Sequence, residues 1–527
     1  MRQLIYLLLI GFCITLSSCR DDFEFKPSSG GLEFSRDTVY LDTVFTNIGS
    51  STYTLKVYNR SNEDISIPSI RLRKGQASKY RLMVDGIPGK EFSNVELLAK
   101  DSMFVFIETT ANIADANTDD FLYTDEIDFS STTGNQEIPL VTLIQDAYFL
   151  YPQRDGEGNY ENIPYNDTLN IYGFNLDEND INNGNEYTWR NNKPYVIYGY
   201  AAVPTGKTLT VDPGARVHFH ADSGLIIKQG GKLVINGGTS TTDALENEVI
   251  FEGDRLEPGF ADIPGQWGAV ILMSDQENTI NHLTLKNAGV GILAQAQQEG
   301  VFPKLTINNS QVYNCANFGI LAVGATISGE NFVANNAGTA AVAFTRGGTY
   351  NFKYSTFGNY FNSYNQVPLL LNDYQQISET AINVQNLTAN FDNCIMYGSS
   401  NIGVSMEKVE GGGTAFNINY RNSLLKLIDF GNQLSSNPLY PGAANAADTT
   451  NMVEYTNCKI ATSTTENKPS FKDAPNNQLQ LITDTEGVGP EGTADPAVVT
   501  LFTVDITGTT RSSAPDMGAY QSTPAED

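Results

Sequence analysis

Short apolar segments recur along residues 195–521, and turns rich in Gly, Asn and Asp separate them. The period is loose, about 20 to 25 residues, which falls in the range of solenoid repeats. Few neighbouring segments are joined by the two-residue turn that closes a tight β-hairpin. Strands this short satisfy their backbone hydrogen bonds when each coil stacks on the coil before it. The pattern therefore predicts a solenoid, with early strands at Leu209–Val211, Gly224–Ile227, Leu233–Ile235 and Val249–Phe251.

Three motifs in this region, Leu209–Gly214, Gly231–Leu233 and Gly265–Gly268, resemble the first coils of secreted right-handed parallel β-helix proteins. The resemblance implies a right-handed parallel β-helix over residues 195–521. About 13 coils, each rising about 4.8 Å, would give a rod of roughly 60 Å. Trp267 lies within the third motif and is predicted to be a core residue rather than a platform for a sugar.

The end of the chain resembles the closing segment of the same class of proteins. The resemblance covers Asp505–Arg511 and Asp516–Tyr520, and residues 522–527 remain as a tail. It implies that Arg511 and Asp516 hold a terminal cap rather than form a catalytic pair.

Residues 30–147 show a different pattern, in which apolar and polar residues alternate over short segments. About seven such strands in roughly 110 residues predict an antiparallel β-sandwich, so the whole chain is expected to be all-β. The strands are Val39–Leu41, Tyr53–Tyr58, Ile65–Ile67, Tyr80–Val84, Met103–Ile107, Tyr123–Phe129 and Glu137–Val141.

The order of these features resembles the abnormal-spindle-like branch of immunoglobulin-type domains. Val57–Asn59, Ile65–Ile67 and Asp101–Val105 carry the resemblance, together with the final strand pair. It implies an immunoglobulin-like module that acts as a spacer or binds a partner.

The N-terminus has the features of a bacterial lipoprotein signal peptide. Arg2 precedes the apolar run Leu4–Ile14, which is too short to span a membrane. Leu16–Cys19 resembles a lipobox, which implies that residues 1–18 are removed and that Cys19 is acylated. Residues 19–29 would then form a tether.

Asp21 and Asp22 follow the lipobox and resemble an acidic signal that exports lipoproteins to the cell surface. An ordinary solvated tether is the alternative. We therefore expect a lipid-anchored outer-membrane protein that faces outward, although the periplasmic orientation stays open. The net charge of −28 opposes binding to nucleic acid.

Three cysteines remain after Cys13 and Cys19, and each directly follows an Asn. Cys315, Cys394 and Cys458 are predicted to be buried thiols at equivalent points of the repeat, because no His lies near them in sequence. No cofactor and no metal site are expected from them.

His218 and His220 lie two residues apart and are expected on the outer face of one strand, near Asp222. A zinc or copper site there is the alternative to exposed histidines, but a third ligand is missing from the pattern.

Residues 148–194 are polar and rich in Tyr, and are expected to be a junction that caps the β-helix. The acidic loops Asp155–Asn159 and Asp177–Asp180 lack the ligand order of an EF-hand, so solvated loops are favoured over calcium sites.

No catalytic residue is predicted. The Gly-His-Gly and Arg-Ile-Lys motifs of polygalacturonases are absent, and Asn117–Asp119 matches their Asn-Thr-Asp only within the sandwich. An Asn-rich aromatic stretch makes Tyr354, Tyr360 and Tyr364 candidates for contact with a glycan, because rings stack on sugars and amides bond hydroxyl groups.

The sequence therefore favours a non-catalytic binding or structural protein that engages a glycan or an outer-membrane protein partner. The alternative is a polysaccharide lyase or a glycoside hydrolase that uses a groove of the β-helix.

Overall fold

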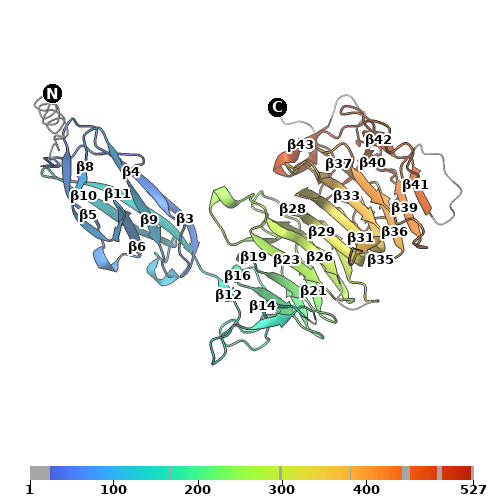
Figure 1. The fold of residues 1–527 in the computed structure, drawn as a ribbon, viewed down its shortest axis with the longest axis horizontal. Coiled ribbons are helices and arrows are strands. Elements are labelled where there is room, and N and C mark those ends of the chain that lie inside the picture. The colour runs from blue at the N-terminus through green and yellow to red at the C-terminus, as the bar shows by residue number, and fades with distance from the viewer. Residues whose placement is uncertain are drawn as a thin grey trace, which may run out of the picture. The chain divides into compact units, whose positions relative to one another are not determined.

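The fold was analysed in a computed structural model, which describes residues 24–523 except 167, 296–299, 380, 442–450 and 484–488. The chain forms two compact units, Met1–Asp146 and Ala147–Asp527 (Figure 1). The predicted signal peptide and Cys19 lie outside the described residues. Over the part of the chain that is described, no helix has the length and hydropathy needed to cross a membrane.

The first unit is a sandwich of two sheets. Strand β8 (Glu91–Leu97) pairs with β5 at the edge of one sheet. The other strands of that six-stranded sheet are β1 (Lys26–Pro27), β5 (Ile65–Leu72), β10 (Leu122–Ser130), β11 (Asn135–Gln145) and β3 (Val39–Phe45). The five-stranded sheet contains β2 (Glu33–Phe34), β4 (Tyr53–Tyr58), β9 (Ser102–Thr109), β6 (Tyr80–Val84) and β7 (Ile87–Gly89).

All seven strands expected in this unit are present, because alternation places every second side chain in the core between the sheets. Leu55, Val57, Val105 and Ile107 are fully buried there. Strand β8 was missed, since several of its residues are polar and exposed.

The second unit is a coil of three parallel sheets, which we call PB1, PB2 and PB3 in the order in which each coil enters them. This arrangement confirms the parallel β-helix. PB1 contains β14 (Asn170–Asn175), β17 (Tyr200–Val203), β20 (Gly224–Ile227), β23 (Trp267–Leu272), β26 (Ala288–Gln295), the first halves of β29 (Phe318–Glu330) and β31 (Ala340–Lys353), β33 (Val367–Asn372) and β38 (Val404–Glu407). PB2 contains β15 (Thr188–Trp189), β18 (Thr208–Val211), β21 (Lys232–Asn236), β24 (Glu277–Asn281), β27 (Lys304–Asn308), the second halves of β29 and β31, β36 (Leu387–Asp392), β39 (Phe416–Arg421) and β41 (Asn451–Thr456). PB3 contains β12 (Tyr148–Leu150), β16 (Tyr195–Ile197), β19 (Arg216–Phe219), β22 (Val249–Gly253), β25 (Leu283–Lys286), β28 (Gln311–Cys315), β30 (Val333–Ala337), β32 (Thr356–Asn359), β37 (Ile395–Gly398), β40 (Leu424–Lys426) and β42 (Lys459–Ala461).

The coil begins earlier than its sequence pattern indicated. Tyr148 pairs with Tyr195 in PB3, and Phe174 pairs with Ala201 in PB1. The segment expected to be a junction is therefore the first coil itself. PB3 has 11 strands, so the coil is shorter than the 13 turns expected.

Among the described residues, three antiparallel strand pairs and four short helices complete the fold, and one of these pairs adds β13 to β14 of PB1. Strand β13 (Asn162–Pro164) pairs with β14, β34 (Tyr374–Gln376) with β35 (Ile382–Val384), and β43 (Phe471–Asp473) with β44 (Gln478–Leu481). The 3₁₀ helices are η1 (Gly75–Ala77), η2 (Ile113–Asp115), η3 (Pro258–Phe260) and η4 (Ala474–Asn476).

A tight corner joins PB2 to PB3 in successive coils, and its key residue has a positive φ angle. Asn is the usual residue there, since its short polar side chain tolerates the left-handed conformation. Tyr354 holds the same place in one coil, with φ of 45°. The Asn residues at this corner are Asn309, Asn331, Asn393, Asn422 and Asn457.

The coil interior contains ladders of like residues. Phe352, Phe391, Tyr420 and Tyr455 face inward at one register position of PB2. Their successive ring centroids lie 6.2, 5.3 and 5.2 Å apart. Trp267 is also in the core, stacked at 4.3 Å on Phe219, as predicted.

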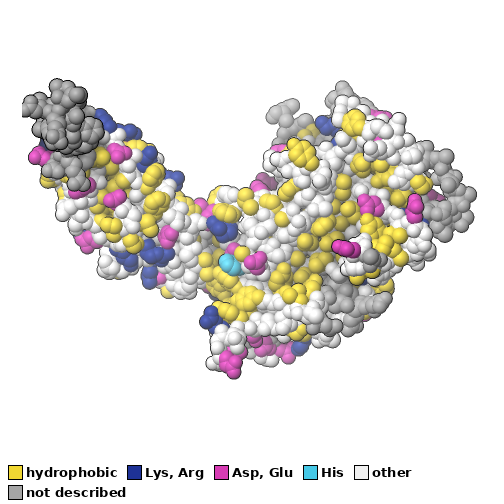
Figure 2. Space-filling view, in the orientation of Figure 1, with side chains coloured by type: hydrophobic (Ala, Val, Ile, Leu, Met, Phe, Trp, Pro, Cys, Tyr) yellow, Lys and Arg dark blue, Asp and Glu magenta, His cyan; other side chains and the backbone are white. Residues whose placement is uncertain are grey.

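The outer face of PB1 is apolar. Ile226, Ile271, Leu293, Leu321 and Leu370 share one outward row, and Figure 2 shows a band of hydrophobic side chains over β23, β26 and β29. Ile163 of the β13–β14 hairpin packs on the first part of this row.

The closing segment lies against the outer face of PB3 instead of capping the end of the coil. Ala519 N donates to Thr356 Oγ1, and Gly518 N donates to Asn393 O. Arg511 donates to Asn331 Oδ1 at 2.7 Å, whereas Asp516 accepts from Gly492 N, before the closing segment, and from Ser522 N, just after it. The two residues hold the closing segment together and onto PB3.

Candidate functional site

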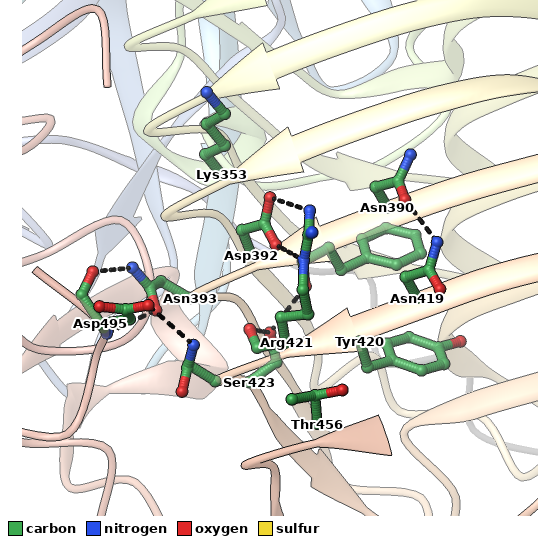
Figure 3. Close-up of polar contacts among 12 residues, drawn as sticks. Lys353, Asn390, Asp392, Asn393, Asn419, Tyr420, Arg421, Ser423, Thr456 and Asp495 are labelled. Carbon is green, nitrogen blue, oxygen red and sulfur yellow. Dashed lines mark hydrogen bonds and ion pairs between the residues drawn. The ribbon is translucent and has the colours of Figure 1, made fainter. Parts of the chain in front are cut away.

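The outer face of PB2 carries two rows of neutral polar side chains, which strand alternation turns away from the core. Asn351, Asn390 and Asn419 occupy one row in successive coils. Asn390 Nδ2 donates to Asn351 Oδ1 and Asn419 Nδ2 donates to Asn390 Oδ1, both at 2.8 Å (Figure 3). The parallel row contains Thr326, Thr349, Thr388 and Asn417.

A third row contains charged groups that are paired with one another. Asp392 accepts from Arg421 Nε at 2.5 Å and from Arg421 Nη2 at 2.9 Å (Figure 3). The hydrogen bond to Asp392 raises the pKa of Arg421. Lys353, in the same row, donates to Val499 O of the closing segment. These contacts leave the two neutral rows as the open part of the face.

The threonine row borders a groove of about 440 Å³. Thr326 and Thr349 line one wall, and the segment after β35 forms the opposite wall. Gln385 Oε1 is buried there and has no hydrogen-bond partner within the described residues. Phe302 is 40% exposed at the groove, so its ring is accessible to a ligand. The full lining is Phe302, Ala325, Thr326, Gly348, Thr349, Val384, Gln385, Asn386 and Thr414, none of which is charged.

A larger cleft of about 930 Å³ lies at the β34–β35 hairpin and has a different lining. Glu407, Lys408 and Glu410 line it together with apolar side chains such as Ile382 and Leu439. Tyr374 Oη donates to Glu407 Oε2 at 2.6 Å. This hydrogen bond, more than burial, raises the pKa of Tyr374 to about 12.

One buried carboxylate holds a wall of each cavity in place. Asp373 Oδ1 accepts from Val409 N at 3.0 Å, and Asp373 Oδ2 accepts from Thr414 Oγ1 at 2.7 Å. Val409 lines the larger cleft and Thr414 lines the groove. Asp373 is fully buried, so its role is to position these walls.

The predicted glycan-contact tyrosines lie in three different environments. Tyr354 is 3% exposed, and the Arg511 guanidinium lies 4.0 Å from its ring centroid. Tyr360 packs against Phe471, whereas Tyr364 is fully exposed. The structure does not bring them together, and only Tyr364 offers an open ring face.

The cysteines are free thiols, and two of them are equivalent by position. Cys394 and Cys458 directly follow the left-handed residues Asn393 and Asn457 at the PB2–PB3 corner. Cys315 instead ends β28, at the opposite end of a PB3 strand. The expectation of three equivalent positions is therefore wrong for Cys315.

The histidines differ from their expected placement. His218 is buried, with Nδ1 3.2 Å from Gly253 O, and burial lowers its pKa. His220 Nδ1 lies 2.7 Å from Asp254 Oδ2, so Asp254 rather than Asp222 is its acidic partner. Of these two histidines, only His220 is exposed.

A single group of metal-ligating side chains meets closely in the described ranges, and it lies in the sandwich. Glu126, Asp128 and Glu137 offer oxygens within 4.8 Å of one another. Arg73 contacts all three, at 2.7 Å for Asp128, so a guanidinium already occupies the place that a cation would take. The acidic loop at Asp155 is likewise satisfied internally, since its carboxylate accepts from Glu157 N and Asn159 N.

The neutral rows were missed by the sequence reasoning, although a signal was present. The pairs Thr349 and Asn351, Thr388 and Asn390, and Asn417 and Asn419 repeat one pattern of alternate residues. This repeat indicates a polar outer face. The opposite wall of the groove has no such signal.

Searches against known protein families and against curated proteins return no match for this chain. Among solved structures, the catalytic domain of a GH87 alpha-1,3-glucanase variant in complex with tetrasaccharides is similar over 70% of this chain and 80% of its own, at 10% identity and a TM-score of 0.20. The same domain with nigerose gives 11% identity, a TM-score of 0.17, and coverage of 72% and 81%. The Agl-KA catalytic domain is 10% identical with a TM-score of 0.15, and the similarity covers 71% of this chain and 80% of that domain. At these values the likeness concerns the all-β fold and carries no argument about activity.

Proposed function

We propose that this chain is an outer-membrane lipoprotein, anchored through Cys19 and exposed at the cell surface, that binds a neutral polysaccharide without cleaving it. The binding surface is the pair of neutral rows on PB2 together with the adjoining groove. The sandwich acts as a spacer between the lipid and the β-helix.

The observation that carries this proposal is the lining of the groove. It offers hydroxyl and amide groups, a buried unpartnered acceptor at Gln385 and the ring of Phe302, and no charge. Hydroxyls and amides bond sugar hydroxyl groups, and a ring face packs on sugar C–H groups. An anionic polysaccharide would require Lys or Arg in the groove to offset its charge.

The rows extend the groove along the coil. Equivalent groups recur about every 4.8 Å, the spacing of neighbouring strands. A polysaccharide is itself a linear repeat of hydroxyl groups, so a chain running along PB2 would meet similar donors and acceptors in the three coils of β31, β36 and β39. Met452 and Glu454 take these positions in the next coil.

Calorimetry with neutral and uronate-containing polysaccharides tests this function. The variant Thr349→Val with Asn386→Ala removes two hydrogen-bonding groups from the groove, and a loss of about 2 kcal/mol would weaken binding roughly 30-fold. Thr210→Val is the matched control, because Thr210 is an outward PB2 residue in an early coil. Unchanged binding by the double variant, or preferential binding of uronates, contradicts the proposal.

A glycoside hydrolase is the second candidate, and the larger cleft favours it. Glycoside hydrolysis requires a pair of carboxyl groups at the scissile bond, and Glu407 and Glu410 line this cleft. Incubation with neutral polysaccharides tests the activity by product release. The protein is an enzyme if it releases product and if Glu407→Gln or Glu410→Gln abolishes that release. The control variant Glu454→Gln, on PB2, should then still release product.

An outer-membrane protein partner is tested separately, by purifying the lipidated chain from its own membranes in mild detergent. A stoichiometric partner would make the protein a subunit of a complex. A chain that elutes alone supports a role in binding polysaccharide independently.

A further inference from the structure

The two outer faces of the sandwich differ in character. On the five-stranded sheet, Thr54, Phe106, Met83 and Pro88 align across β4, β9, β6 and β7. Phe104 is 49% exposed, and its ring stacks beside that of Phe106 at 6.2 Å. Exposed aromatic and aliphatic side chains that gather on one face mark a contact surface. We call Met83, Phe104 and Phe106 the apolar patch.

Basic side chains border the apolar patch. Lys56 Nζ lies 5.3 Å from the ring centroid of Phe104. Arg60 lies over the ring of Tyr58 at 4.2 Å and forms an ion pair with Glu33 at 2.8 Å. Arg81, beside the patch, contacts Glu108. Long basic side chains and aromatic rings are the usual combination at a membrane interface.

The opposite face is acidic. Asp128 pairs in register with Arg71 and with Glu137, and Arg71 pairs with Glu91. Two basic side chains on this face, Arg71 and Arg73, offset only part of its negative charge. The outward carboxylates are those of Glu91, Glu96, Glu126, Asp128 and Glu137. Such a face is repelled by anionic headgroups, so charge distinguishes the two faces of the sandwich.

The length of the tether limits how far the sandwich lies from an anchored lipid. Four residues lie between Cys19 and Glu24, the first described residue, so five Cα–Cα steps join the two. An extended chain spans at most about 3.6 Å per residue, so the tether reaches roughly 18 Å. Strand β1, the first strand after the tether, pairs with β5 of the six-stranded sheet, and β2 then pairs with β4, which neighbours β9 and the apolar patch.

We propose that the apolar patch, with its basic border, rests on the lipid surface to which the chain is anchored. The tether in this inference rests on the proposed function, namely the acylation of Cys19. The contact of the apolar patch with lipid does not depend on it. The sandwich would thereby orient the protein on the membrane as well as space it.

Site-specific tryptophan quenching tests the contact. A chain beginning at Cys19, with Cys458→Ser to remove a partly accessible thiol, is coupled through Cys19 to maleimide lipid in phosphatidylcholine–phosphatidylglycerol vesicles. Coupling supplies the anchor whether or not cells acylate Cys19, so failure here is distinct from failure of the proposed function. The probe is Phe104→Trp, and the matched control is Tyr40→Trp, since Tyr40 is 65% exposed on the other sheet.

Brominated lipids quench tryptophan that touches the bilayer. We expect loss of the added emission and a blue shift for Phe104→Trp, and neither change for Tyr40→Trp. The native Trp189 and Trp267 are buried and give a constant background. Quenching of both probes, of the control alone or of neither overturns the proposal.

Discussion

Replacement of Asp373 by Ala tests the link between the fold and the binding groove. The side chain accepts hydrogen bonds from Val409 and Thr414, which lie in the loop between β38 and β39. Ala removes both acceptors and leaves the two donors without partners. We expect this loop to open while the coil beneath it stays folded.

The contacts set the size of the effect. A hydrogen bond to a charged group contributes about 1.5–3 kcal/mol, so two of them contribute roughly 3–6 kcal/mol. A factor of ten corresponds to about 1.4 kcal/mol, so even the lower value raises opening of the loop more than 100-fold. Polysaccharide affinity should fall as the loop opens more often, because Thr414 of this loop lines the groove.

Hydrogen exchange followed by mass spectrometry measures the opening at residues 408–415, and calorimetry measures binding. The control is Asp505→Ala, which removes a buried carboxylate that also accepts backbone N–H groups, from Thr507, Thr509 and Gln521, but that lines neither cavity. Wild-type exchange at 408–415 in Asp373→Ala would refute the positioning role. Faster exchange with unchanged affinity would refute the groove as the binding site.

Three further predictions concern the core, the thiols and the histidines. Phe391→Ala should lower the free energy of unfolding by about 3–5 kcal/mol, because it leaves a cavity in the aromatic ladder. Urea unfolding, followed by the emission of Trp189 and Trp267, measures the change. An unchanged urea midpoint would contradict a stabilising role for the ladder. Burial raises the pKa of Cys315 to about 12 and also raises the pKa of Cys394, so mass spectrometry should find both thiols unmodified by iodoacetamide near neutral pH until the chain unfolds. Rapid modification of Cys315 in the folded chain would refute its burial. Burial also lowers the pKa of His218 and of His282, so the unfolded state binds protons more readily and the free energy of unfolding should fall as pH drops below about 6.5. Urea midpoints at about pH 7.5 and about pH 5.5 should therefore differ less in the double variant His218→Gln, His282→Gln than in the wild type. An equal difference in the two proteins would rule out this cause.

The strands of the sandwich could be predicted because alternation is a local signal. Tyr53–Tyr58 and Tyr80–Val84 coincide with β4 and β6, since each buried side chain is two residues from the next. The start of the β-helix could not be placed this way. The first coil is interrupted by long polar loops, and its short strands are identified only by pairing with the second coil.

The candidate site was predictable in part. The neutral rows repeat in the sequence, so a polar outer face follows from alternation. The groove was not predictable, because Thr349 and Asn386 come from different coils and meet only when the coils stack. Tyr354 was misjudged for a similar reason, since Arg511, more than 150 residues later, covers its ring.

The sequence by itself determined that this chain is all-β, that it divides near residue 147, and that its larger part coils into parallel sheets. These properties follow from side-chain periodicity and turn residues, which act over a few positions. Only the tertiary structure decided which polar groups remain open to a ligand. Thr349 stays exposed, whereas His218 is buried and Tyr354 is covered by Arg511, which is distant in sequence. Burial is a property of the assembled coils, so no local pattern contains it.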